Sequence, residues 1–571
     1  MSLVVQLDAP LPAELAVGSG TALFVVGTCF ARDAGIASLS LLVDGDEQPV
    51  MAHGMPRLDL LRARDEPASY RSGFWGIARI PAAADGAAAV ELRLRARLAT
   101  GADATVELGR IPLAAAPAPL EVAAPAAGPL VAICMTTYEP PLELLARQLG
   151  SIREQTHPNW VCVISDDCSS PERFAAIEAA IADDPRFVLS RSPGRLGFYR
   201  NFERALSLAP AAADYVALAD QDDAWHPDKL ATLVAEVGDA RLIYSDARVI
   251  DRDGGVIAET YWGRRSNNHS SLLSLLVANS VTGAASLFPA ALLADALPFP
   301  PAQFAHFHDH WLALVALSLG DIAFVDRPLY DYVQHGDATL GHAAANRMPD
   351  MRERLAAVRR DPHERVRMWR MHYYVDACRL LQFAAILRLR GGERIPAAKR
   401  RELERFERAD RSLLPLAALA ARGLQELLGR RRETLGAEWM LFHAFAWRRL
   451  LSASARDRPT RRLRLDSLPP TVLDPRPGAR APAEPVVRRL GDKIAPLRLA
   501  VRDDAPRRVN LLIPTIDLQH FFAGYIGKFN FARRLAKRGV RVRIVTVDPV
   551  GELPLSWRRD LEAYSGLAGL L

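Results

Sequence analysis

Cysteine is scarce in this sequence of 571 residues. The five cysteines are scattered, odd in number, and without the CxxC spacing of a thiolate metal site. A disulfide-stabilised scaffold and a cysteine-based zinc site are therefore excluded, and the thiols indicate a reducing compartment. The five are Cys29, Cys134, Cys162, Cys168 and Cys378.

The sequence also lacks a secretion signal and a long apolar run. Its first residues, MSLVVQLDAPLPAEL, have no basic start and reach Asp8 before any long hydrophobic stretch. One uncharged window, 270–294, approaches membrane length, but Asn279, Thr282 and Pro289 would leave polar groups unpaired in hydrocarbon. We therefore predict no transmembrane helix and a cytoplasmic protein, with a peripheral position at the inner membrane face as its one expected membrane contact.

Acidic residues are few in one part of the chain. The net charge is +6, but residues 343–510 hold 38 Lys and Arg against 20 Asp and Glu, whereas the rest holds 34 against 46. A local arginine surplus suits phosphate, an anionic membrane or nucleic acid, and it is equally typical of solvated helix faces. The basic residues lack the aromatic neighbours of RNA-binding modules, so we expect no nucleic-acid partner.

Half of the residues are apolar, which is typical of a chain that buries packed cores, and the length suits about three or four domains. Residues 1–115 form short apolar-patterned segments separated by turns such as Asp44-Gly45, which predicts an N-terminal β-sandwich as an accessory domain. Residues 116–129 are almost entirely Ala and Pro and are predicted to be a linker.

Residues 130–345 change to alternating strands and helices. The apolar run 130–135 is typical of a buried parallel strand, and Pro140-Pro141 opens a segment with leucines at helical spacing. This alternation predicts a doubly wound, Rossmann-like α/β sheet. The further strands are expected at 160–164, 187–190 and 215–219, and the further helices after Pro171, over 197–208 and from Pro227.

The remaining residues divide by composition. An Arg-, Ala- and Leu-rich segment predicts an α-helical extension, a Pro- and Arg-rich segment predicts a second linker, and the last segment predicts a partial Rossmann-like β-α-β unit. The three segments are 346–455, 456–505 and 506–571.

Polar and acidic residues follow the predicted strands of the α/β region, where parallel sheets bind ligands. Asp166 and Asp167 follow the second strand, and Asp220, Asp222 and Asp223 follow the fourth. Three carboxylates within four residues repel one another unless a cation lies among them, so Mg²⁺ or Mn²⁺ is expected there. The alternatives are an acidic loop before a Pro-started helix and, for the Asp166-Asp167 pair, a helix N-cap.

Several motifs, in this order, resemble the inverting nucleotide-sugar glycosyltransferases of family 2, which have the GT-A fold. The resemblance spans residues 130–342. The motifs are MTTYEPP, SDDCSSP, GRLGFYRNFERAL, ADQDDAWHPDKL, and the pair HDHWLAL with YDYVQHGDATLG.

The resemblance implies a set of residues that bind the nucleotide-sugar donor. The turn after the first strand and the first acidic pair would hold base and ribose, a glycine turn and helix would pack beside them, and the first acid of the DxD motif would lie near the ribose. These residues are Thr136, Thr137, Tyr138, Asp166, Asp167, Gly197, Arg200, Asn201 and Asp220.

The resemblance also implies metal ligands and a catalytic base. Asp222, Asp223 and His335 would contact the metal that bridges the diphosphate. Asp309, at the start of a predicted helix, occupies the place of the base that deprotonates the acceptor hydroxyl. Residues 279–283 resemble the acceptor-side loop, where small residues would let a sugar approach the backbone.

Two positions depart from the family pattern. The usual proline after the first strand is absent, and Cys168 replaces the usual glycine of the acidic turn, which affects nucleotide selectivity more than reaction class. The DQDDxW and HDxW motifs are most similar to a rhamnosyltransferase branch, which implies dTDP-rhamnose as donor, with UDP-sugars left open. Residues 510–549 resemble the opening of a GT-B glycosyltransferase, but an incomplete one, so no second activity is expected.

Together these patterns predict a metal-dependent inverting glycosyltransferase that moves a sugar to a cell-surface polysaccharide, such as an O-antigen, or to a lipid-linked glycan acceptor. One alternative is a carbohydrate-binding or scaffolding protein with a degenerate transferase domain, and another is a nucleotide-binding regulator or nucleotidyltransferase. The presence of Asp220, Asp222 and Asp309 together favours the enzyme, because a degenerate site needs none of them.

Overall fold

The structure is a computed structural model. The chain divides into two compact units, Met1–Ala483 and Glu484–Leu571, and each is described by itself. The described residues are 3–57, 60–61, 64, 66–82, 87–115, 117–122, 126–262, 265–302, 306–334, 362–452, 509–513 and 531–546.

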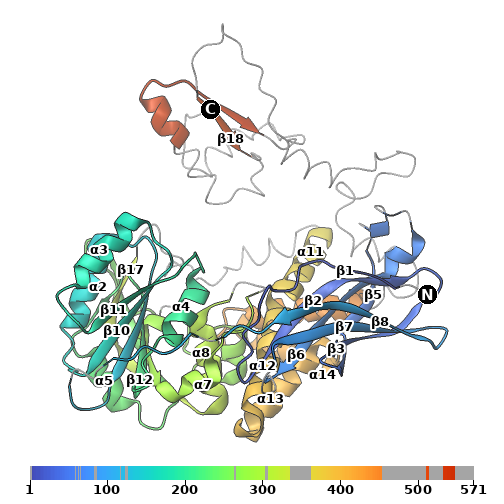
Figure 1. Ribbon diagram of the computed structural model, residues 1–571, viewed down its shortest axis with the longest axis horizontal. Helices are drawn as coiled ribbons and strands as arrows, with labels where there is room; N and C mark the ends of the chain where they lie inside the picture. Colours follow the sequence, from blue (N-terminus) through green and yellow to red (C-terminus); the bar gives the residue numbers. More distant parts are fainter. Residues whose placement is uncertain are drawn as a thin grey trace. The chain divides into compact units, whose positions relative to one another are not determined.

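Two four-stranded antiparallel sheets form the N-terminal part of the first unit (Figure 1). Apolar and polar residues alternate along residues 89–98, so their sheet buries mainly one face, and side chains such as Leu23, Leu41 and Leu94 share one core between the two sheets. The other sheet is buried on both faces, because Ala22 and Phe24 belong to the core shared with the helices. One sheet has the order β1 (Leu3–Leu7), β2 (Gly20–Ala31), β6 (Gly73–Pro81), β5 (Ala52–Met55), and the other β4 (Asp46–Pro49), β3 (Ile36–Val43), β7 (Ala89–Leu98), β8 (Asp103–Pro112).

A nine-stranded sheet follows, and its first half is parallel. Its strands are almost wholly apolar because helices cover both faces. The strand order in this half is β11 (Phe187–Arg191), β10 (Trp160–Asp166), β9 (Val131–Thr137) and β12 (Tyr215–Ala219). The connecting helices are α2 (Leu142–Arg153), α3 (Pro171–Ile181) and α4 (Phe198–Ser207).

The second half of this sheet is mixed, which differs from the doubly wound parallel sheet predicted from the sequence. The short strand β16 (Ser286–Pro289) pairs antiparallel with both β12 and β14 (Leu242–Asp251), and β14 pairs parallel with β17 (Ile322–Gln334). The edge strands are β13 (Ala224–Trp225), antiparallel to β17, and β15 (Val256–Ala258), antiparallel to β14. The helices here are α5 (Lys229–Glu236), α6 (Leu272–Val277), α7 (Leu293–Ala296) and α8 (His308–Leu319).

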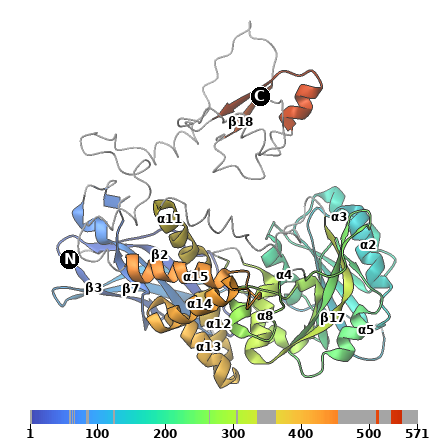
Figure 2. The ribbon, with the colours of Figure 1, turned by 180° about the vertical axis from the view of Figure 1, so that it is seen from behind.

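A group of helices closes the first unit. In Figure 2, α12 lies between the N-terminal sheets and α8, and it contacts both β2 and α8. None of the helices in the described ranges combines the length and the apolar character that crossing a bilayer requires. The helices are α11 (Pro362–His372), α12 (Cys378–Gly391), α13 (Ala397–Glu407), α14 (Leu413–Leu427) and α15 (Ala437–Ala446), with π-helical turns at Tyr373–Ala377 and Trp447–Ser452.

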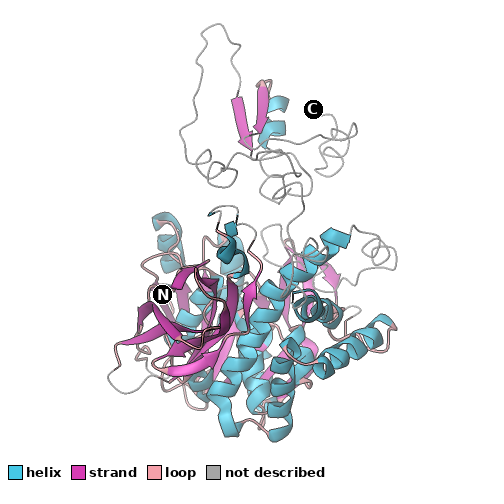
Figure 3. Cartoon of the chain, turned by 90° about the vertical axis from the view of Figure 1, so that its right-hand side faces the viewer, coloured by secondary structure: helices cyan, strands magenta, loops and turns pink. Residues whose placement is uncertain are grey.

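The three parts of the first unit share one hydrophobic core, and Figure 3 shows helices lying beside the N-terminal strands. Trp75 Nε1 of β6 donates to the hydroxyl of Tyr373 at 3.1 Å. Arg390 of α12, almost wholly buried, donates to Gly20 O at 2.6 Å, to Asp295 O and Ala296 O at 3.0 Å each, and to Pro298 O at 2.7 Å. The sheets and helices are therefore joined by buried contacts rather than by the chain alone.

The described part of the second unit is small. The strand β18 (Val509–Ile513) pairs parallel with β19 (Val542–Thr546), and residues 531–537 between them are helical. This is a β-α-β arrangement, and the resemblance of the segment to a GT-B opening stays a prediction.

Candidate active site

The turns that follow β9, β10 and β12 meet at one edge of the sheet, because β9 lies between the other two strands and runs parallel to both. The backbone of Tyr138 is joined to the acidic loop by Gln221. Tyr138 N donates to Gln221 Oε1 at 2.9 Å, and Gln221 Nε2 donates to Tyr138 O at 3.4 Å. The ring of Tyr138 is partly exposed, with the guanidinium of Arg195 4.0 Å from its centroid.

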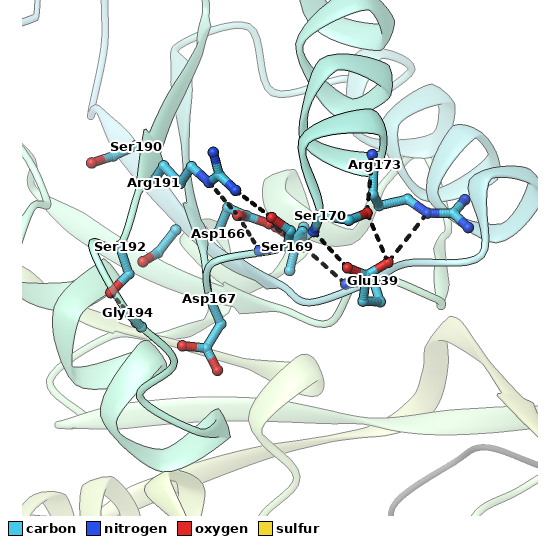
Figure 4. A network of polar contacts seen from close by, with 12 residues as sticks. Glu139, Asp166, Asp167, Ser169, Ser170, Arg173, Ser190, Arg191, Ser192 and Gly194 are labelled. Carbon is cyan, nitrogen blue, oxygen red and sulfur yellow. Dashed lines mark hydrogen bonds and ion pairs between the residues drawn. The ribbon is translucent and has the colours of Figure 1, made fainter.

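Asp166 is wholly buried, and its carboxylate accepts hydrogen bonds from its own surroundings (Figure 4). Its Oδ1 accepts from Thr137 Oγ1 at 3.1 Å and from Ser169 Oγ at 2.6 Å, and its Oδ2 accepts from Ser169 N at 2.9 Å. These bonds hold Cys168 at φ 60°, a left-handed conformation that glycine adopts more readily. In this arrangement Asp166 shapes the turn and offers no exposed oxygen to a ribose.

Asp167 points away from that network in Figure 4, toward the start of α4. Its two carboxylate oxygens accept from Leu196 N at 2.5 Å and from Gly197 N at 2.9 Å. Gly197 has φ 81° and precedes the first residue of α4. Asp167 therefore fixes the loop that enters α4, and the N-cap interpretation of the acidic pair does not describe it, because Ser170 caps α3 instead.

Asn201 and Arg200 are neighbours on α4 with different surroundings. The buried Asn201 accepts from Ser165 Oγ at 2.7 Å and donates to Ser165 O at 2.9 Å, so it ties α4 to the end of β10. Arg200 pairs with Glu203 and donates to the carbonyl oxygens of Phe299 and Pro300. The structure thus directs Arg200 toward the 299–300 segment and away from the β9 turn.

The acidic loop places Asp220, Asp222 and Asp223 directly after β12. Burial, together with the charges of Asp222 and Asp309, raises the pKa of Asp220 to about 7. Burial also raises the pKa of Asp223 well above its usual range, with Asp220 and Asp222 adding to the effect. A bound cation would offset the repulsion among these three carboxylates and favour their ionised forms.

The donor set suits a hard divalent ion that keeps water and phosphate ligands. Asp223 Oδ1 accepts from Val333 N at 3.3 Å, while its buried Oδ2 has no hydrogen-bond partner among the described residues. No group of three or more His, Cys, Asp or Glu within the described ranges is arranged to hold a metal by itself. One or two of these carboxylates together with a diphosphate would complete the coordination. The third expected ligand, His335, lies outside the described residues.

Lys229, at the start of α5, is a functional candidate that the sequence did not single out. It is wholly buried beneath the acidic loop, its Nζ donates to Ala284 O, and the ring centroid of Trp225 lies 3.5 Å away. Burial lowers the pKa of Lys229 well below its usual range, against the opposing charges of Asp223 and Asp220. A lysine after His-Pro-Asp ordinarily lies on a helix surface, so nothing in the sequence pattern indicated its burial.

Asp309 lies in the first turn of α8, where its Oδ1 accepts from His310 N at 2.6 Å. Burial raises the pKa of Asp309 to about 6, while bonds from the N–H groups of His310 and Gly283 and from the side chain of Asn279 lower it. Because the charge of Asp309 also raises the pKa of Asp220, the two carboxylates share one site. The structure thus brings together the DxD loop and the residue expected to act as base.

The 279–283 loop packs directly against this residue. A Cβ on Gly283 would lie 2.7 Å from His308 Nε2 and 3.4 Å from the Cβ of Asp309. The small residue at this position therefore accommodates α8 itself, whereas the sequence suggested room for a sugar.

Two tyrosines complete the surroundings of the carboxylates: Tyr261 lies outside the motifs, and Tyr332 belongs to the motif YDYVQHGDATLG but was not expected to act in the site. Burial is the main cause that raises the pKa of both tyrosines; the charge of Asp309 adds to the effect at Tyr261, and the charge of Asp223 adds to it at Tyr332. Their ring centroids lie 6.0 Å apart. Only the fold brings Tyr261, after β15, next to β17.

Residues 132–286 match the family model described as glycosyl transferase family 2. The matched range contains β9 to β12, the turn after β10 and the acidic loop.

Two curated relatives are similar over short segments. The uncharacterized protein y4gI of Sinorhizobium fredii is 34% identical over 133 residues, which is 22% of this chain and 14% of that protein. WcaA of Escherichia coli, named as a candidate glycosyl transferase of colanic acid biosynthesis, is 29% identical over 107 residues, which is 19% of this chain and 37% of WcaA. The chain therefore spans well under half the length of these relatives.

Among solved structures, the chain is similar to residues 1–349 of S. aureus TarS in complex with UDP-GlcNAc, at 15% identity and a TM-score of 0.32, over 58% of this chain and 92% of that one. The family assignment rests on the sequence matches and not on this structural similarity. On these matches, residues 132–286 form a domain of glycosyl transferase family 2.

Proposed function

We propose that this chain is a metal-dependent inverting glycosyltransferase that takes a sugar from a nucleotide-sugar donor. The observation that carries the proposal is the position of Asp309: a partly buried carboxylate with a pKa of about 6 at the start of α8, close enough to Asp220 to raise its pKa. The family match of residues 132–286 supports the same reaction class.

The donor would bind at the edge formed by the turns after β9, β10 and β12. Asp166 and Asp167 would serve by ordering these turns, since their oxygens are already bonded to Ser169, Thr137 and the start of α4. The partly exposed ring of Tyr138 would then lie against the nucleotide base. Thr136, Gly197 and Asn201 would support the same site from β9 and α4, whereas Arg200 would act indirectly, by fixing the 299–300 segment to α4.

Asp222 and Asp223 are the residues that would hold the metal, with Asp220 beside them and His335 as a further ligand. Bound there, a divalent ion supplies positive charge that stabilises the departing diphosphate. Lys229 lies under the loop and would keep the carboxylates in place when the ion exchanges with solvent.

Asp309 would accept the proton of the acceptor hydroxyl. At neutral pH a carboxyl with a pKa of about 6 is mostly ionised, so it can take a proton and still be strong enough to polarise the hydroxyl. As the proton moves to Asp309, the acceptor oxygen bonds to the anomeric carbon while the bond to the diphosphate breaks on the opposite face. The configuration of the sugar is thereby inverted. Asn279 and Gly283 hold the carboxylate in position for this step.

For the donor we propose dTDP-rhamnose, with UDP-sugars as the alternative, and for the acceptor a cell-surface polysaccharide or a lipid-linked glycan. The printed name of WcaA, which refers to colanic acid, supports a polysaccharide acceptor. The five free cysteines support a reducing, cytoplasmic location, because four of them are buried as thiols.

The test is a donor panel. Purified full-length protein with Mg²⁺ or Mn²⁺ is mixed with glycan acceptors and with dTDP-rhamnose, UDP-sugars and GDP-sugars, and product sugar and free nucleotide are measured. We expect one donor to be turned over, and Asp222→Ala and Asp309→Asn to reduce the rate by roughly 10²-fold or more. Asp239→Asn, an exposed aspartate after α5, is the matched control and should leave the rate unchanged.

A different result would favour a carbohydrate-binding protein. Metal-dependent donor binding without turnover by any acceptor would remove Asp309 from the role of base. Turnover that persists at the wild-type rate in Asp309→Asn would do the same while leaving the enzyme assignment in place.

A further inference from the structure

The helix α14 exposes an apolar face that no described residue covers. Leu413 is 56% exposed, Leu414 83%, Leu424 51% and Leu428, directly after the helix, 60%. Single exposed leucines are common on proteins, but three on one helix with a fourth directly after it form a surface that marks a binding site.

The exposed residues lie on one side of the helix. At about 100° per residue, the exposed positions of the 413–428 segment fall within an arc of about 140°. The opposite side is fixed in the protein: Leu416 and Leu419 are buried, and a Cβ on Gly423 would lie 3.1 Å from Trp439 N of α15. The helix is therefore held with its apolar face outward. The exposed positions are Leu413, Leu414, Ala417, Ala418, Ala421, Leu424, Gln425 and Leu428.

The exposed charges of the 408–432 segment have one sign. Arg408 and Arg411 are exposed before the helix, and Arg430 and Arg432 are exposed after it. The two acidic residues of the 408–432 segment, Asp410 and Glu426, are both buried. Every exposed residue of the segment is consequently apolar, glycine, glutamine or arginine.

An apolar face bordered by arginines at both ends is complementary to an anionic bilayer. Its leucines suit the boundary between headgroups and acyl chains, and its arginines suit acidic headgroups. The fifteen residues of α14 extend about 22 Å, less than the hydrocarbon thickness of about 30 Å, so the helix would lie along the surface.

We propose that the exposed face of α14 docks this protein on an anionic membrane surface, with Leu414 and Leu424 inserted and Arg408, Arg411, Arg430 and Arg432 on acidic lipid headgroups. The contact is separate from the donor site, so it stands or falls independently of the proposed reaction.

Flotation of the full-length protein with vesicles tests this proposal. Vesicles of phosphatidylcholine alone are compared with vesicles that also contain phosphatidylglycerol. We expect the protein to float only with the anionic vesicles, and added salt to release it. The Leu414→Ser/Leu424→Ser double variant should bind the anionic vesicles at least roughly tenfold more weakly than the wild type.

Two control variants separate this surface from general effects. Val256→Ser/Ile257→Ser replaces two half-exposed apolar residues on β15 and should float like the wild type. Arg430→Gln/Arg432→Gln should weaken binding to anionic vesicles and reduce its salt dependence. Circular dichroism and thermal unfolding confirm that each variant is folded, and donor turnover with a soluble acceptor should be unchanged in all three.

The proposal is overturned if the wild type does not float with anionic vesicles, or if the leucine variant floats as well as the wild type. It is also overturned if light scattering shows a wild-type dimer that the leucine variant converts to a monomer without any vesicle binding, since the face would then contact a second copy.

Discussion

Asp309 is held between opposing influences. Burial disfavours its charge, while the N–H groups of His310 and Gly283 and the side chain of Asn279 favour it, and the balance sets the pKa of this carboxyl at about 6. A base with this pKa gains proton affinity over an ordinary aspartate and is still ionised at neutral pH.

At saturating Mg²⁺ or Mn²⁺ the cation should keep Asp220, Asp222 and Asp223 ionised, so the rate should depend on pH through Asp309. We expect kcat/KM to rise tenfold per pH unit below about pH 6 and to level off above it, because only the ionised form accepts the proton. A pH series with the turned-over donor measures this. Asp239→Asn should keep the inflection, and a wild-type profile that stays flat down to pH 5 contradicts the assignment.

The ionised carboxylate of Asp309 should lower the stability of the folded protein at neutral pH. The pKa of Asp309 in the folded state is raised above the ordinary 3.8. The contribution of this carboxyl to the free energy of unfolding is therefore fully present below about pH 4 and is lost as the pH rises through about 6. Asp309→Asn removes this loss and should raise the free energy of unfolding at pH 7 by about 1–3 kcal/mol, with little change at pH 4. Urea unfolding at both pH values is the measurement. An equal effect at pH 4 and pH 7 would show that packing, not charge, is responsible.

Cys168 offers a prediction without any bearing on the reaction. It adopts φ 60° inside the turn held by Asp166, a conformation that strains a residue with a side chain. Cys168→Gly should raise the free energy of unfolding by about 1 kcal/mol, and Cys168→Ala should not, since alanine keeps the strain. Thermal unfolding of the two variants distinguishes strain from the loss of a thiol.

The sequence predicted which residues lie at the strand ends and helix starts, but it did not predict the contacts that their side chains make. Asp220, Asp222 and Asp309 lie together as the motif order indicated, because strand ends and helix starts are local features. Asp166 and Asp167 stand at the expected turn, yet their oxygens bond to Ser169 and to the start of α4, and such partners depend on tertiary distances. The burial of Lys229 and the approach of Tyr261 to Asp309 have the same origin.

At the scale of the element, the loop before β16 and the start of α8 fit together through the absence of a side chain. Gly283 approaches His308 closely, and the His308 ring stacks on Phe202 at 3.6 Å between centroids, so it has no free direction in which to move. The N–H of Gly283 also bonds to Asp309.

Gly283→Ala should therefore affect both stability and rate. The added Cβ displaces His308 or the loop, which should lower the free energy of unfolding by about 1–3 kcal/mol and reduce kcat more than it raises the donor KM. Gly194→Ala, at a loop glycine where a Cβ meets nothing within 4 Å, is the control. A variant with wild-type kcat would show that the loop does not position Asp309.

The elements were predictable where the chain alternates regularly. The strands β9 to β12 and helices α2 to α5 lie close to the residues indicated by apolar runs and by Pro171 and Pro227. The mixed second half of the sheet was not foreseen, since β16 has only four residues and β13 only two, too few to show a period. Their pairing depends on β12, β14 and β17, which are distant in sequence.

At the scale of the whole first unit, Arg390 joins parts that are far apart in the sequence. Its guanidinium donates to carbonyl groups of residues 20, 295, 296 and 298. Arg390→Met would remove a donor from each of these carbonyl groups, of which Ala296 O keeps Trp311 Nε1, and should lower the free energy of unfolding by about 3–5 kcal/mol. Arg394→Met removes a largely exposed arginine that pairs with Asp295 and should cost about 1 kcal/mol or less. Urea unfolding compares the two, and equal losses would refute a joining role for Arg390.

The buried joint between the N-terminal strands and the helices has an evolutionary consequence. Trp75 and Tyr373, or Ala22 and Gln382, meet in one core although nearly the whole unit separates them in sequence. A crossover that exchanged only the N-terminal strands between homologous genes would set a foreign surface against these helices. The N-terminal strands and the helices would therefore have to be exchanged together. New specificity would arise more readily from point substitutions in the turns at the sheet edge than from exchange of the N-terminal strands alone.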